Sequence, residues 1–374
     1  MQIRAAVLER PGAPRPYGTS RPLAIRELAL EEPGPGEVRI AIRAAGLCHS
    51  DLSVIDGSRP RPLPMVLGHE AAGVVEAVGA GVTDLRPGAH VVAAFVPACG
   101  RCAPCRAERP ALCEPGFEAN RAGTLLSGAR RLSRAGAPLN HHLGVSAFAT
   151  HATLARESLT QVDAAIPFPL AALFGCAVIT GVGAVANTAE LPAGASVAIV
   201  GLGGVGLAAL LGARALGAGT VVALDLDSGK RTLALELGAT HALDAASAQA
   251  PAEARRLLGG GADFAFEMAG SARALELAFA ITRRGGTTVA AGLAPPDARF
   301  ALAPVQLVAE ERTLKGSYLG SCVPKRDIPR FLGWHAAGRL PVERLLDRTL
   351  GLEELNEAFE ALALGGVRRQ ILLP

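Results

Sequence analysis

The sequence predicts an α/β protein in which a β-rich domain is joined to a doubly wound parallel sheet. Short alternating apolar runs between Pro-Gly turns fill the first half, and strand-like and helix-like runs alternate from Ser196 onward. The length of 374 residues fits two domains. Half of the residues are hydrophobic (50%) and 19% are charged, which supports a large core and excludes wholesale disorder.

The β-rich domain is predicted from three runs with strand character, 38–42, 71–79 and 90–94. The turn dipeptides Pro35-Gly36 and Pro87-Gly88 separate these runs. Short strands with regular turns indicate a small barrel-like domain. The Pro-rich segment 10–22 is predicted to be a surface loop, without an assigned function.

The character of the sequence changes near Pro167, and the apolar segment 169–186 that follows is predicted to be largely helical. We place the sheet domain at 178–319 and the β-rich domain at 1–177 together with 320–374. The predicted strands are 196–200, 220–224, 262–266, 287–291 and, near the C-terminus, 369–373; the predicted helices are 205–216, 229–237, 252–258, 272–281 and 352–362.

A glycine-rich loop, Gly201-Leu202-Gly203-Gly204-Val205-Gly206, joins the first strand of this sheet to its first helix. In such a loop Gly201 permits a tight turn, Gly203 lets the backbone approach a pyrophosphate, and Gly206 lets the helix pack on the strand. The N–H groups and the positive dipole at the helix start attract phosphates. We therefore expect a Rossmann-type dinucleotide site that uses these residues, Gly204 included.

Asp225 ends the second predicted strand, at about the distance of 20 residues expected of a ribose-binding acid. We expect its carboxylate to bind the adenosine ribose hydroxyls and to repel a 2′-phosphate, which favours NAD over NADP. The alternative is a structural turn followed by an Asp that caps a helix.

Four cysteines form a cluster with the spacing of a metal site, namely Cys99, Cys102, Cys105 and Cys113. Four thiolates can surround one zinc ion with no open position, which is typical of a structural site. A redox pair would leave two cysteines unexplained, and an iron–sulfur run places its last cysteine sooner, before a Pro. Incidental cysteines are the remaining alternative. We expect this lobe to shape a surface or a subunit contact, away from the chemistry.

Three scattered residues, Cys48, His69 and Cys176, are candidate ligands of a second metal. Each taken alone is more often a buried structural residue, and their spacing does not unite them. However, four motifs follow one another along the chain: the segment Gly68-His69-Glu70-Ala71-Ala72-Gly73-Val74-Val75, the cysteine cluster, the Cys176 motif and the glycine loop. In these motifs and in their order, the chain resembles the zinc-containing medium-chain alcohol dehydrogenases over nearly its full length.

The resemblance implies a GroES-like catalytic domain and two zinc ions per chain. Cys48, His69 and Cys176 would hold the catalytic ion and leave its fourth position to water or substrate. Glu70 would lie near the ion and coordinate it transiently, and Asp51 would orient His69. For both carboxylates the alternative is simple neutralisation of a polar cluster.

Ser50 occupies the hydroxyl-relay position of the family. Many relatives complete this relay with a His three residues later, where this chain has Ser53, a residue that is no base near neutral pH. His49 or water is left as the outer end of the relay. The other implied contacts are those of His49 and Arg369 with the pyrophosphate, Thr180 and Val205 with the nicotinamide, Lys230 with the adenosine ribose and Phe95 with the substrate.

Those contacts have structural alternatives: a surface histidine for His49, core packing for Thr180, Val205 and Phe95, and a solvated lysine for Lys230. Four other residues carry no functional signal, namely Cys322, His141, His142 and Trp334.

The segments 116–142 and 144–149 resemble the branch that includes benzyl alcohol and glutathione-dependent formaldehyde dehydrogenases. The glutathione-specific enzymes carry acidic residues just past the first ligand motif, where this chain has Ser58-Arg59-Pro60-Arg61-Pro62. We therefore expect NAD-linked oxidation of a primary alcohol, aromatic or medium-chain, to its aldehyde. S-(hydroxymethyl)glutathione dehydrogenase activity is an alternative.

Two other classes of function compete with this prediction. A zinc-free reductase or a non-catalytic relative would share the fold, but the three ligand candidates and Ser50 argue against it. A zinc module that binds nucleic acid or protein is disfavoured by the net charge of +3 and by the lack of a basic patch.

Neither a nucleic acid nor a membrane is expected as a partner. The most apolar stretch, 195–213, contains the glycine loop and therefore does not predict a membrane span. No export signal precedes the first strand-like runs, which favours the cytoplasm. We also expect a homo-oligomer, either a dimer or a tetramer.

Overall fold

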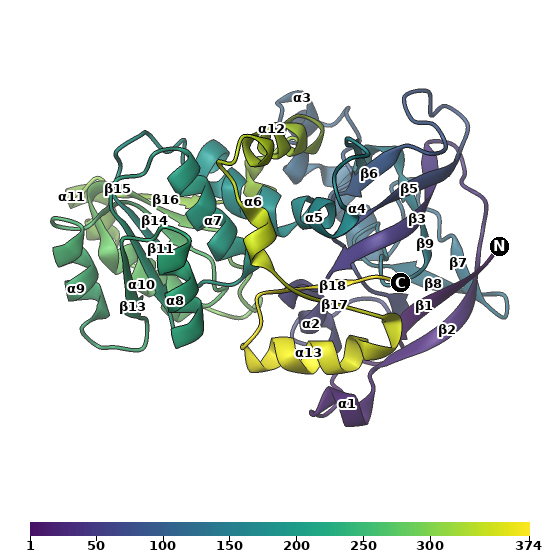
Figure 1. Ribbon diagram of the computed structural model, residues 1–374, viewed down its shortest axis with the longest axis horizontal. Helices are drawn as coiled ribbons and strands as arrows, with labels where there is room; N and C mark the ends of the chain where they lie inside the picture. The colour runs from purple at the N-terminus through teal and green to yellow at the C-terminus, as the bar shows by residue number, and fades with distance from the viewer. The chain divides into compact units, whose positions relative to one another are not determined.

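The structure, a computed structural model, describes residues 1–374 and divides into two compact units (Figure 1). Unit 1 consists of Met1–Cys176, Val323–Pro329 and Leu346–Pro374. Unit 2 consists of Ala177–Cys322 and Arg330–Leu345. Unit 1 contains a barrel and a sheet with two hydrophobic clusters, and unit 2 contains one sheet with its own hydrophobic cluster.

Unit 1 contains a closed barrel and a seven-stranded sheet. The barrel follows the order β1 (Gln2–Leu8), β2 (Leu23–Leu30), β7 (Leu132–Arg134), β8 (Ala137–His141) and β4 (Met65–Val66). The sheet follows the order β10 (Leu159–Gln161), β6 (His90–Ala93), β5 (Ala71–Val78), β3 (Glu37–Gly46), β18 (Arg369–Leu372) and β17 (Leu346–Leu350), with β9 (His151–Ala155) paired to β3.

Strand β1 shows why this unit needs apolar residues on both faces of a strand. Ile3 and Val7 belong to one hydrophobic cluster, whereas Ala6 and Leu8 belong to another. Successive side chains of a strand point to opposite faces, so this one strand separates two cores. The helices of unit 1 are short: α1 (Tyr17–Ser20), α2 (His49–Ile55), α3 (Ala103–Arg106), α4 (Glu114–Ala122), α5 (Phe168–Ala172) and α13 (Leu355–Leu364).

Unit 2 is a parallel six-stranded sheet of doubly wound topology. Its order is β13 (His241–Asp244), β12 (Val221–Asp225), β11 (Val197–Val200), β14 (Ala262–Glu267), β15 (Thr282–Ala290) and β16 (Thr313–Gly316). The strand order reverses beside β11, and ligands of such sheets bind at this switch point. The helices are α6 (Ala177–Gly183), α7 (Gly204–Ala215), α8 (Ser228–Glu236), α9 (Ala250–Leu257), α10 (Ala272–Ile281) and α11 (Pro304–Ala309), while α12 (Pro324–Ala336) spans the division between the units.

The central strands of unit 2 are buried on both faces. Ala198 and Val200 of β11 pack in one cluster with residues of α9 and α10, and the alternating Val197 and Ile199 are fully buried as well. A parallel sheet covered on both faces requires such continuous apolar strands. This requirement explains why runs of Val, Ile, Leu and Ala mark these strands in the sequence.

The division between the units differs from the sequence prediction mainly in one segment. We expected all of 320–374 to belong to the first domain, whereas residues 330–345 belong to unit 2, as do Ala177 and residues 320–322 at the predicted boundaries. Three arginines of this segment, Arg330, Arg339 and Arg344, hydrogen-bond to Asn187, Ala215 and Glu236 respectively. These long-range polar contacts have no local pattern in the sequence.

Two predicted segments show more detail in the structure than the sequence indicated. The stretch 169–186 is largely helical, as predicted, but Cys176 interrupts it: with φ −144° and ψ −70°, this residue ends the helical turn Leu173–Gly175 before α6 begins. The stretch 10–22 is not a plain surface loop, because it contains α1 with Tyr17 buried. Arg15 pairs with Glu360 of α13, which ties this segment to the helix.

No single helix of the chain is long and apolar enough to cross a membrane. Phe168–Gly175 and Ala177–Thr188 form a bent pair that meets the test only by length and composition.

Candidate active site and metal centres

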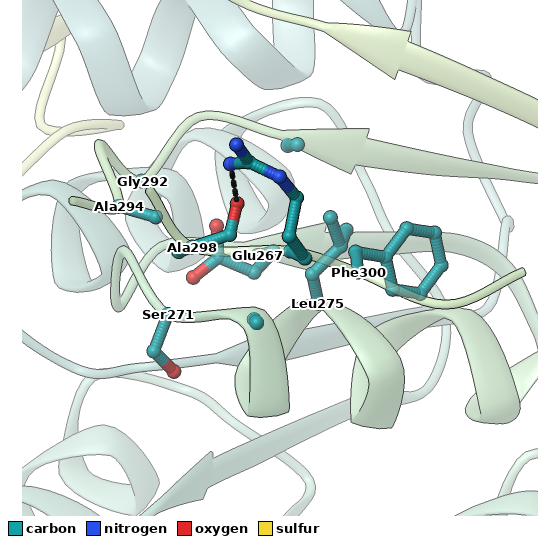
Figure 2. A pocket seen from close by; sticks show the side chains of 10 residues that line it. Glu267, Ser271, Leu275, Gly292, Ala294, Ala298 and Phe300 are labelled. Carbon is teal, nitrogen blue, oxygen red and sulfur yellow. Dashed lines mark hydrogen bonds between the residues drawn. The ribbon is translucent and has the colours of Figure 1, made fainter. Parts of the chain in front are cut away.

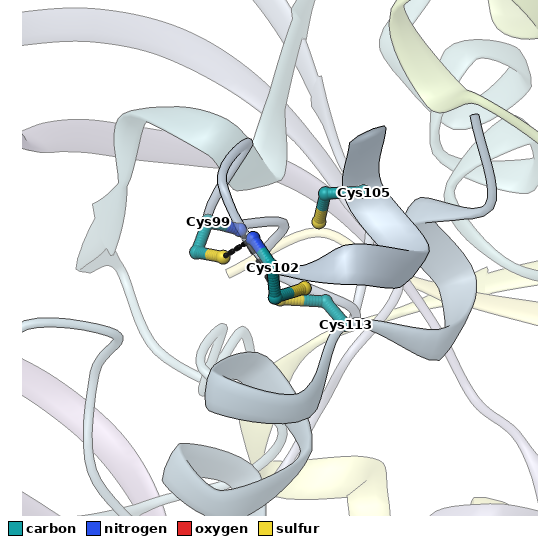
Figure 3. A group of neighbouring side chains, drawn as sticks. All are labelled: Cys99, Cys102, Cys105 and Cys113. Carbon is teal, nitrogen blue, oxygen red and sulfur yellow. Dashed lines mark hydrogen bonds between the residues drawn. The ribbon is translucent and has the colours of Figure 1, made fainter. Parts of the chain in front are cut away.

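The cysteine lobe, residues 99–113 of unit 1, brings its four thiols together (Figure 3). All four sulfur atoms lie within 4.8 Å of one another, and those of Cys102 and Cys113 are 3.9 Å apart. Two sulfurs on one tetrahedral zinc ion are about 3.8 Å apart, given Zn–S bonds of about 2.3 Å. The arrangement therefore fits one zinc ion with four cysteine ligands.

Backbone N–H groups turn toward the sulfur atoms of the lobe. Cys102 N donates to Cys99 Sγ at 3.3 Å, and Cys99 N donates to Cys113 Sγ at 3.2 Å. Although burial opposes it, donation by backbone amides lowers the pKa of the Cys99 thiol to about 6. Burial raises the pKa of the Cys105 thiol to about 12. Four thiols that crowd together are best accommodated by a cation that replaces their protons.

The second site is formed by Cys48, His69 and Cys176, which we call the buried site. Cys48 lies between β3 and α2, His69 lies between β4 and β5, and Cys176 lies just before α6. Their ligand atoms lie within 4.8 Å of one another, and their exposed fractions are 8%, 1% and 6%. Three residues that are far apart in the sequence thus converge, as the resemblance implied.

The two thiols of the buried site share polar contacts. The Cys176 thiol holds the pKa of Cys48 well below its usual range, against the opposing effect of burial and with the help of His69. The same contact and burial raise the pKa of Cys176. Two sulfurs and one nitrogen form a donor set that suits zinc and leaves one tetrahedral position for another ligand.

Asp51 anchors the imidazole of His69. Its Oδ1 lies 3.1 Å from His69 Nδ1 and accepts a hydrogen bond of 3.0 Å from Gly68 N. Because a carboxylate only accepts, Nδ1 carries the proton and Nε2 is left as the nitrogen that can bind a metal. Burial would raise the pKa of Asp51, but His69 and His142 outweigh it and lower that pKa to about 2.

Glu70 and Arg369 form a fully buried ion pair next to this site. Arg369 also donates to Leu47 O at 3.1 Å. The resemblance implied a pyrophosphate contact for Arg369, and in the structure its protein partners are Glu70 and Leu47. Burial raises the pKa of Glu70 to about 7, although Arg369 opposes the shift. Gly46 allows this pair, because a Cβ there would lie 2.5 Å from Glu70 Oε1.

The candidate residues for the proton relay, His49, Ser50 and Ser53, lie on helix α2, which begins directly after Cys48. His49 is exposed and Ser50 is half-buried. Ser53 Oγ donates a hydrogen bond to His49 O at 2.8 Å. The hydroxyl at the position where many relatives have a His is therefore bound to the helix backbone. This contact leaves His49 and water as the candidates for the outer end of a relay from Ser50.

Two aromatic rings flank His69 edge-on. The Phe95 ring, expected at the substrate site, lies 5.5 Å from the His69 ring. The His142 ring lies 5.6 Å from it, and His142 Nδ1 is 3.1 Å from Asp51 Oδ1. Sequence reasoning found no role for His142, because nothing local links it to a residue 91 positions earlier.

The glycine loop of unit 2 has the geometry that its residue types predicted. Gly201 has φ +95°, which other residues rarely adopt, and a Cβ at Gly206 would lie 1.8 Å from Gly201 O. A Cβ at Gly203 would meet nothing within 4 Å, so the space beside this residue is open. Gly204 and Val205 begin α7 and are half-buried. Open space at a helix start suits a phosphate group.

Asp225 lies at the end of β12 and contacts this loop. Its Oδ2 accepts from Leu202 N at 2.6 Å, and its Oδ1 accepts from Asp227 N at 2.9 Å. Lys230 lies in the first turn of α8, where its N–H is capped by Asp227. The carboxylate thus ties the glycine loop to the second strand and remains half-buried.

Thr180 lies on α6 near the start of α7. The neighbouring Gly181 packs so closely that a Cβ there would lie 2.2 Å from Val205 O. The Thr180 hydroxyl is buried and has no hydrogen-bond partner. The structure therefore brings Thr180 and Val205, the two expected nicotinamide contacts, to one region of unit 2.

A pocket that the sequence did not indicate lies at the carboxyl ends of β14 and β15 (Figure 2). Glu267 lines it and is buried, with Oε1 accepting from Ala269 N at 2.8 Å and from Gly270 N at 2.6 Å. Burial raises the pKa of Glu267, although these amides oppose the shift. Glu267 thereby orders the turn at Ala269, against which Gly201 packs.

Comparison with known families gives two matches. The alcohol dehydrogenase GroES-like domain matches residues 34–164, and the zinc-binding dehydrogenase domain matches residues 204–337. A relative from Mycobacterium tuberculosis, provisionally named alcohol dehydrogenase D, is 40% identical over 377 residues that cover 100% of both chains. The chain belongs to the zinc-dependent medium-chain alcohol dehydrogenase family.

Two more proteins are similar to this chain over its full length. S-(hydroxymethyl)glutathione dehydrogenase from Paracoccus denitrificans is 34% identical over 383 residues, 100% of each chain. The crystal structure of benzyl alcohol dehydrogenase from Acinetobacter calcoaceticus is 31% identical, has a TM-score of 0.93, and covers 100% of this chain and 99% of that chain. The predicted family and the predicted two-part fold are confirmed.

Proposed function

We propose that this alcohol dehydrogenase uses zinc and NAD to interconvert a primary alcohol, aromatic or medium-chain, and its aldehyde. The convergence of Cys48, His69 and Cys176 in a buried cluster carries this proposal. Membership of the zinc-dependent family supports it. In this proposal the buried site holds the catalytic zinc, with Glu70 beside it, and the four thiols of the cysteine lobe hold a structural zinc.

When bound, the catalytic zinc supplies Lewis acidity that polarises the substrate oxygen. The protein's own residues orient the metal ligand, move the proton and exclude water. Asp51 keeps the proton on Nδ1 of His69 and so fixes the ring. The Ser50 hydroxyl would bridge the substrate oxygen and the nicotinamide ribose. It would accept the alcohol proton while giving up its own toward the ribose, and His49 or water would carry that proton onward. Phe95 forms an apolar wall beside His69 and excludes water.

The preference for NAD is proposed to rest on Asp225. Its carboxylate follows the second strand and touches the glycine loop, so an added 2′-phosphate would meet a negative charge. Gly201, Gly203, Gly204 and Gly206 would pass beneath the pyrophosphate. The remaining proposed cofactor contacts are made by His49, Thr180, Val205, Lys230 and Arg369.

The proposed substrate class is supported by the similarity to benzyl alcohol dehydrogenase. The similarity to S-(hydroxymethyl)glutathione dehydrogenase favours a second candidate, the glutathione adduct. Arg59 and Arg61 lie in the segment after α2, where glutathione-specific enzymes carry acidic residues. A basic segment would not bind the glutathione amine, so we favour the simple alcohol.

The test combines elemental metal analysis with initial rates on benzyl alcohol, an aliphatic alcohol series and S-(hydroxymethyl)glutathione, each with NAD and NADP. We expect two zinc ions per chain and the highest kcat/KM for benzyl alcohol with NAD. One zinc per chain without turnover would favour the alternative in which the cysteine lobe holds a structural zinc and no catalytic zinc is bound. A preference for the glutathione adduct or for a polyol would replace the proposed substrate.

The cofactor proposal is tested by Asp225→Ala. We expect the ratio of kcat/KM for NAD over NADP to fall by at least tenfold, because the repelling charge is gone. Lys230→Ala is the comparison variant with the opposite sign: it removes a positive charge proposed beside the adenosine ribose, so the ratio should not fall. An unchanged ratio in Asp225→Ala would exclude Asp225 as the selecting residue.

We also propose that the enzyme is a homo-oligomer. The edge strand β16 of unit 2 is exposed along its whole length, and exposed edge strands readily pair with another chain. Light scattering after size-exclusion chromatography would show a dimer or tetramer, and a monomer would contradict the proposal.

A further inference from the structure

His142 is a buried imidazole that the proposed reaction does not use. Its side chain is 1% exposed, and its Nδ1 lies 3.1 Å from Asp51 Oδ1, the oxygen that also serves His69. The rings of His69 and His142 stand edge to face with an interplanar angle of 89°. One carboxylate is therefore shared by two imidazoles of unit 1.

The hydrogen-bonding groups of Asp51 and His142 complement each other. Asp51 Oδ1 already accepts from Gly68 N and is close to both imidazoles, whereas Oδ2 is buried without any partner. His142 Nδ1 is likewise buried without a hydrogen-bond partner, and the nearest charged group is Asp51 Oδ1, 3.1 Å away. A buried carboxylate oxygen and a buried ring N–H are each costly alone, so their proximity stabilises both.

The backbone of His142 is held by a tight turn. Its N–H donates to Ser146 Oγ at 2.9 Å, and its carbonyl accepts from Val145 N at 3.0 Å. Leu143 and Ser146 have φ values of +52° and +56°. Non-glycine residues keep such angles only where the surroundings dictate them. The turn therefore presents the imidazole from a fixed position.

We propose that His142 is a positioning residue, which holds the Asp51 carboxylate so that His69 directs Nε2 at the catalytic metal. The inference rests on the proposed function, because it requires zinc at Cys48, His69 and Cys176. His142 acts through Asp51 and touches neither metal nor substrate. Groups behind a metal ligand commonly change metal affinity or activity by about 10–100-fold when they are removed.

The neighbouring His141 offers a matched control. It is buried to the same extent, but its Nε2 accepts from Arg131 N at 3.1 Å, away from Asp51. A defect that merely loosens packing would follow from replacing either histidine. An effect transmitted through Asp51 would follow only from replacing His142.

The experiment compares His142→Phe, His142→Asn and His141→Phe in the full-length zinc enzyme. The Phe variant keeps a ring and loses the N–H, whereas the Asn amide restores a donor near the Nδ1 position. The readouts are the rate of zinc release to a chromogenic chelator and the separate kcat and KM values for benzyl alcohol and NAD. We expect His142→Phe to release the buried-site zinc about tenfold faster or more. Its kcat should fall by a similar factor while the KM for NAD stays within twofold.

His142→Asn should recover most of the wild-type release rate, and His141→Phe should leave that rate within threefold. Asp51→Asn should accelerate release by itself, and adding His142→Phe to it should cause no further acceleration. Full additivity in this double-mutant cycle would overturn the proposal, as would equal release from His141→Phe and His142→Phe. If the wild-type enzyme holds one zinc per chain, the proposed function itself fails, and the inference with it.

Discussion

The cysteine lobe and the buried site use similar ligands in opposite ways. The lobe takes four thiols from a span of 15 residues, with three of the four half-exposed. The buried site takes two thiols and an imidazole from three distant elements and adds Asp51 behind the imidazole. A set of four protein ligands suits a structural ion, whereas three protein ligands leave one coordination position for water or substrate.

The difference teaches that the surroundings, more than the ligands, separate the two sites. Backbone amides are the hydrogen-bond donors to the lobe sulfurs Cys99 and Cys113. The buried site is surrounded by side chains that carry charge, namely Asp51, Glu70 and Arg369. Burying such charged groups costs free energy of folding, and in a metal site they hold protons and orient the ligands.

The largest expected effect comes from Cys48→Ser. We expect kcat to fall by at least 1,000-fold, about 4 kcal/mol, because one ligand of the buried site is lost. Zinc content should fall from two ions per chain to one, while NAD binding, measured by fluorescence titration, persists. Unchanged turnover would remove Cys48 from the metal site.

The matched variant in the lobe is Cys102→Ser. It should also lower the zinc content by one ion per chain, but its main effect should be to make residues 99–113 less ordered. Limited proteolysis should cut the lobe faster, because zinc binding contributes on the order of 10 kcal/mol to ordering such a segment. A kcat loss equal to that of Cys48→Ser would contradict the distinction between the sites.

The next largest effect is expected from Arg369→Met, which leaves the Glu70 carboxylate buried without its partner. Breaking a buried pair by removing one member costs about 3–5 kcal/mol. Urea unfolding should show this loss of stability. The double variant Arg369→Met/Glu70→Gln should regain most of it, and a double variant as unstable as the single one would refute the pairing argument.

A smaller effect is expected from pH through His141. Burial lowers the pKa of this imidazole to about 4. The unfolded chain binds a proton near pH 6.5 and the folded chain does not, so stability is full above that pH and declines toward pH 4. The decline amounts to about 3 kcal/mol for a shift of this size. Urea unfolding of His141→Gln should lack this component between pH 6.5 and 4.

The smallest effect is expected from Phe117→Ser on helix α4, next to the lobe. The Phe117 side chain is 62% exposed, so its removal should change the free energy of unfolding by about 0.5 kcal/mol or less. Turnover and zinc content should stay at wild-type values. A loss above about 2 kcal/mol would show that this face of the lobe is covered in solution.

Periodicity and turn chemistry predicted much of the fold. Helix α10 occupies the predicted residues Ala272–Ile281, and the strands around the glycine loop begin and end within a few residues of their predicted bounds. These elements are dictated by neighbours in the sequence. The break at Cys176 was not predicted, because the apolar run 169–186 gives no local reason to end a helix there.

The long-range contacts of the buried site could not be predicted from spacing. The Glu70–Arg369 pair joins residues 299 positions apart, and the approach of His142 to Asp51 spans 91. Family resemblance supplied the ligand candidates Cys48, His69 and Cys176, yet it assigned no role to His142. A contact between distant side chains depends on how sheets and helices pack, which no local pattern records.

The sequence alone determined the features that rest on adjacent residues: the glycine loop, the four-cysteine lobe and the alternation that builds the doubly wound sheet. Steric limits on glycine and the short reach between neighbouring thiols act within a few residues, so they can be read along the chain. Only the tertiary structure decided which buried charges meet around His69. That outcome depends on burial and on the pairing of Asp51, Glu70, His142 and Arg369, which exist only once the chain is packed.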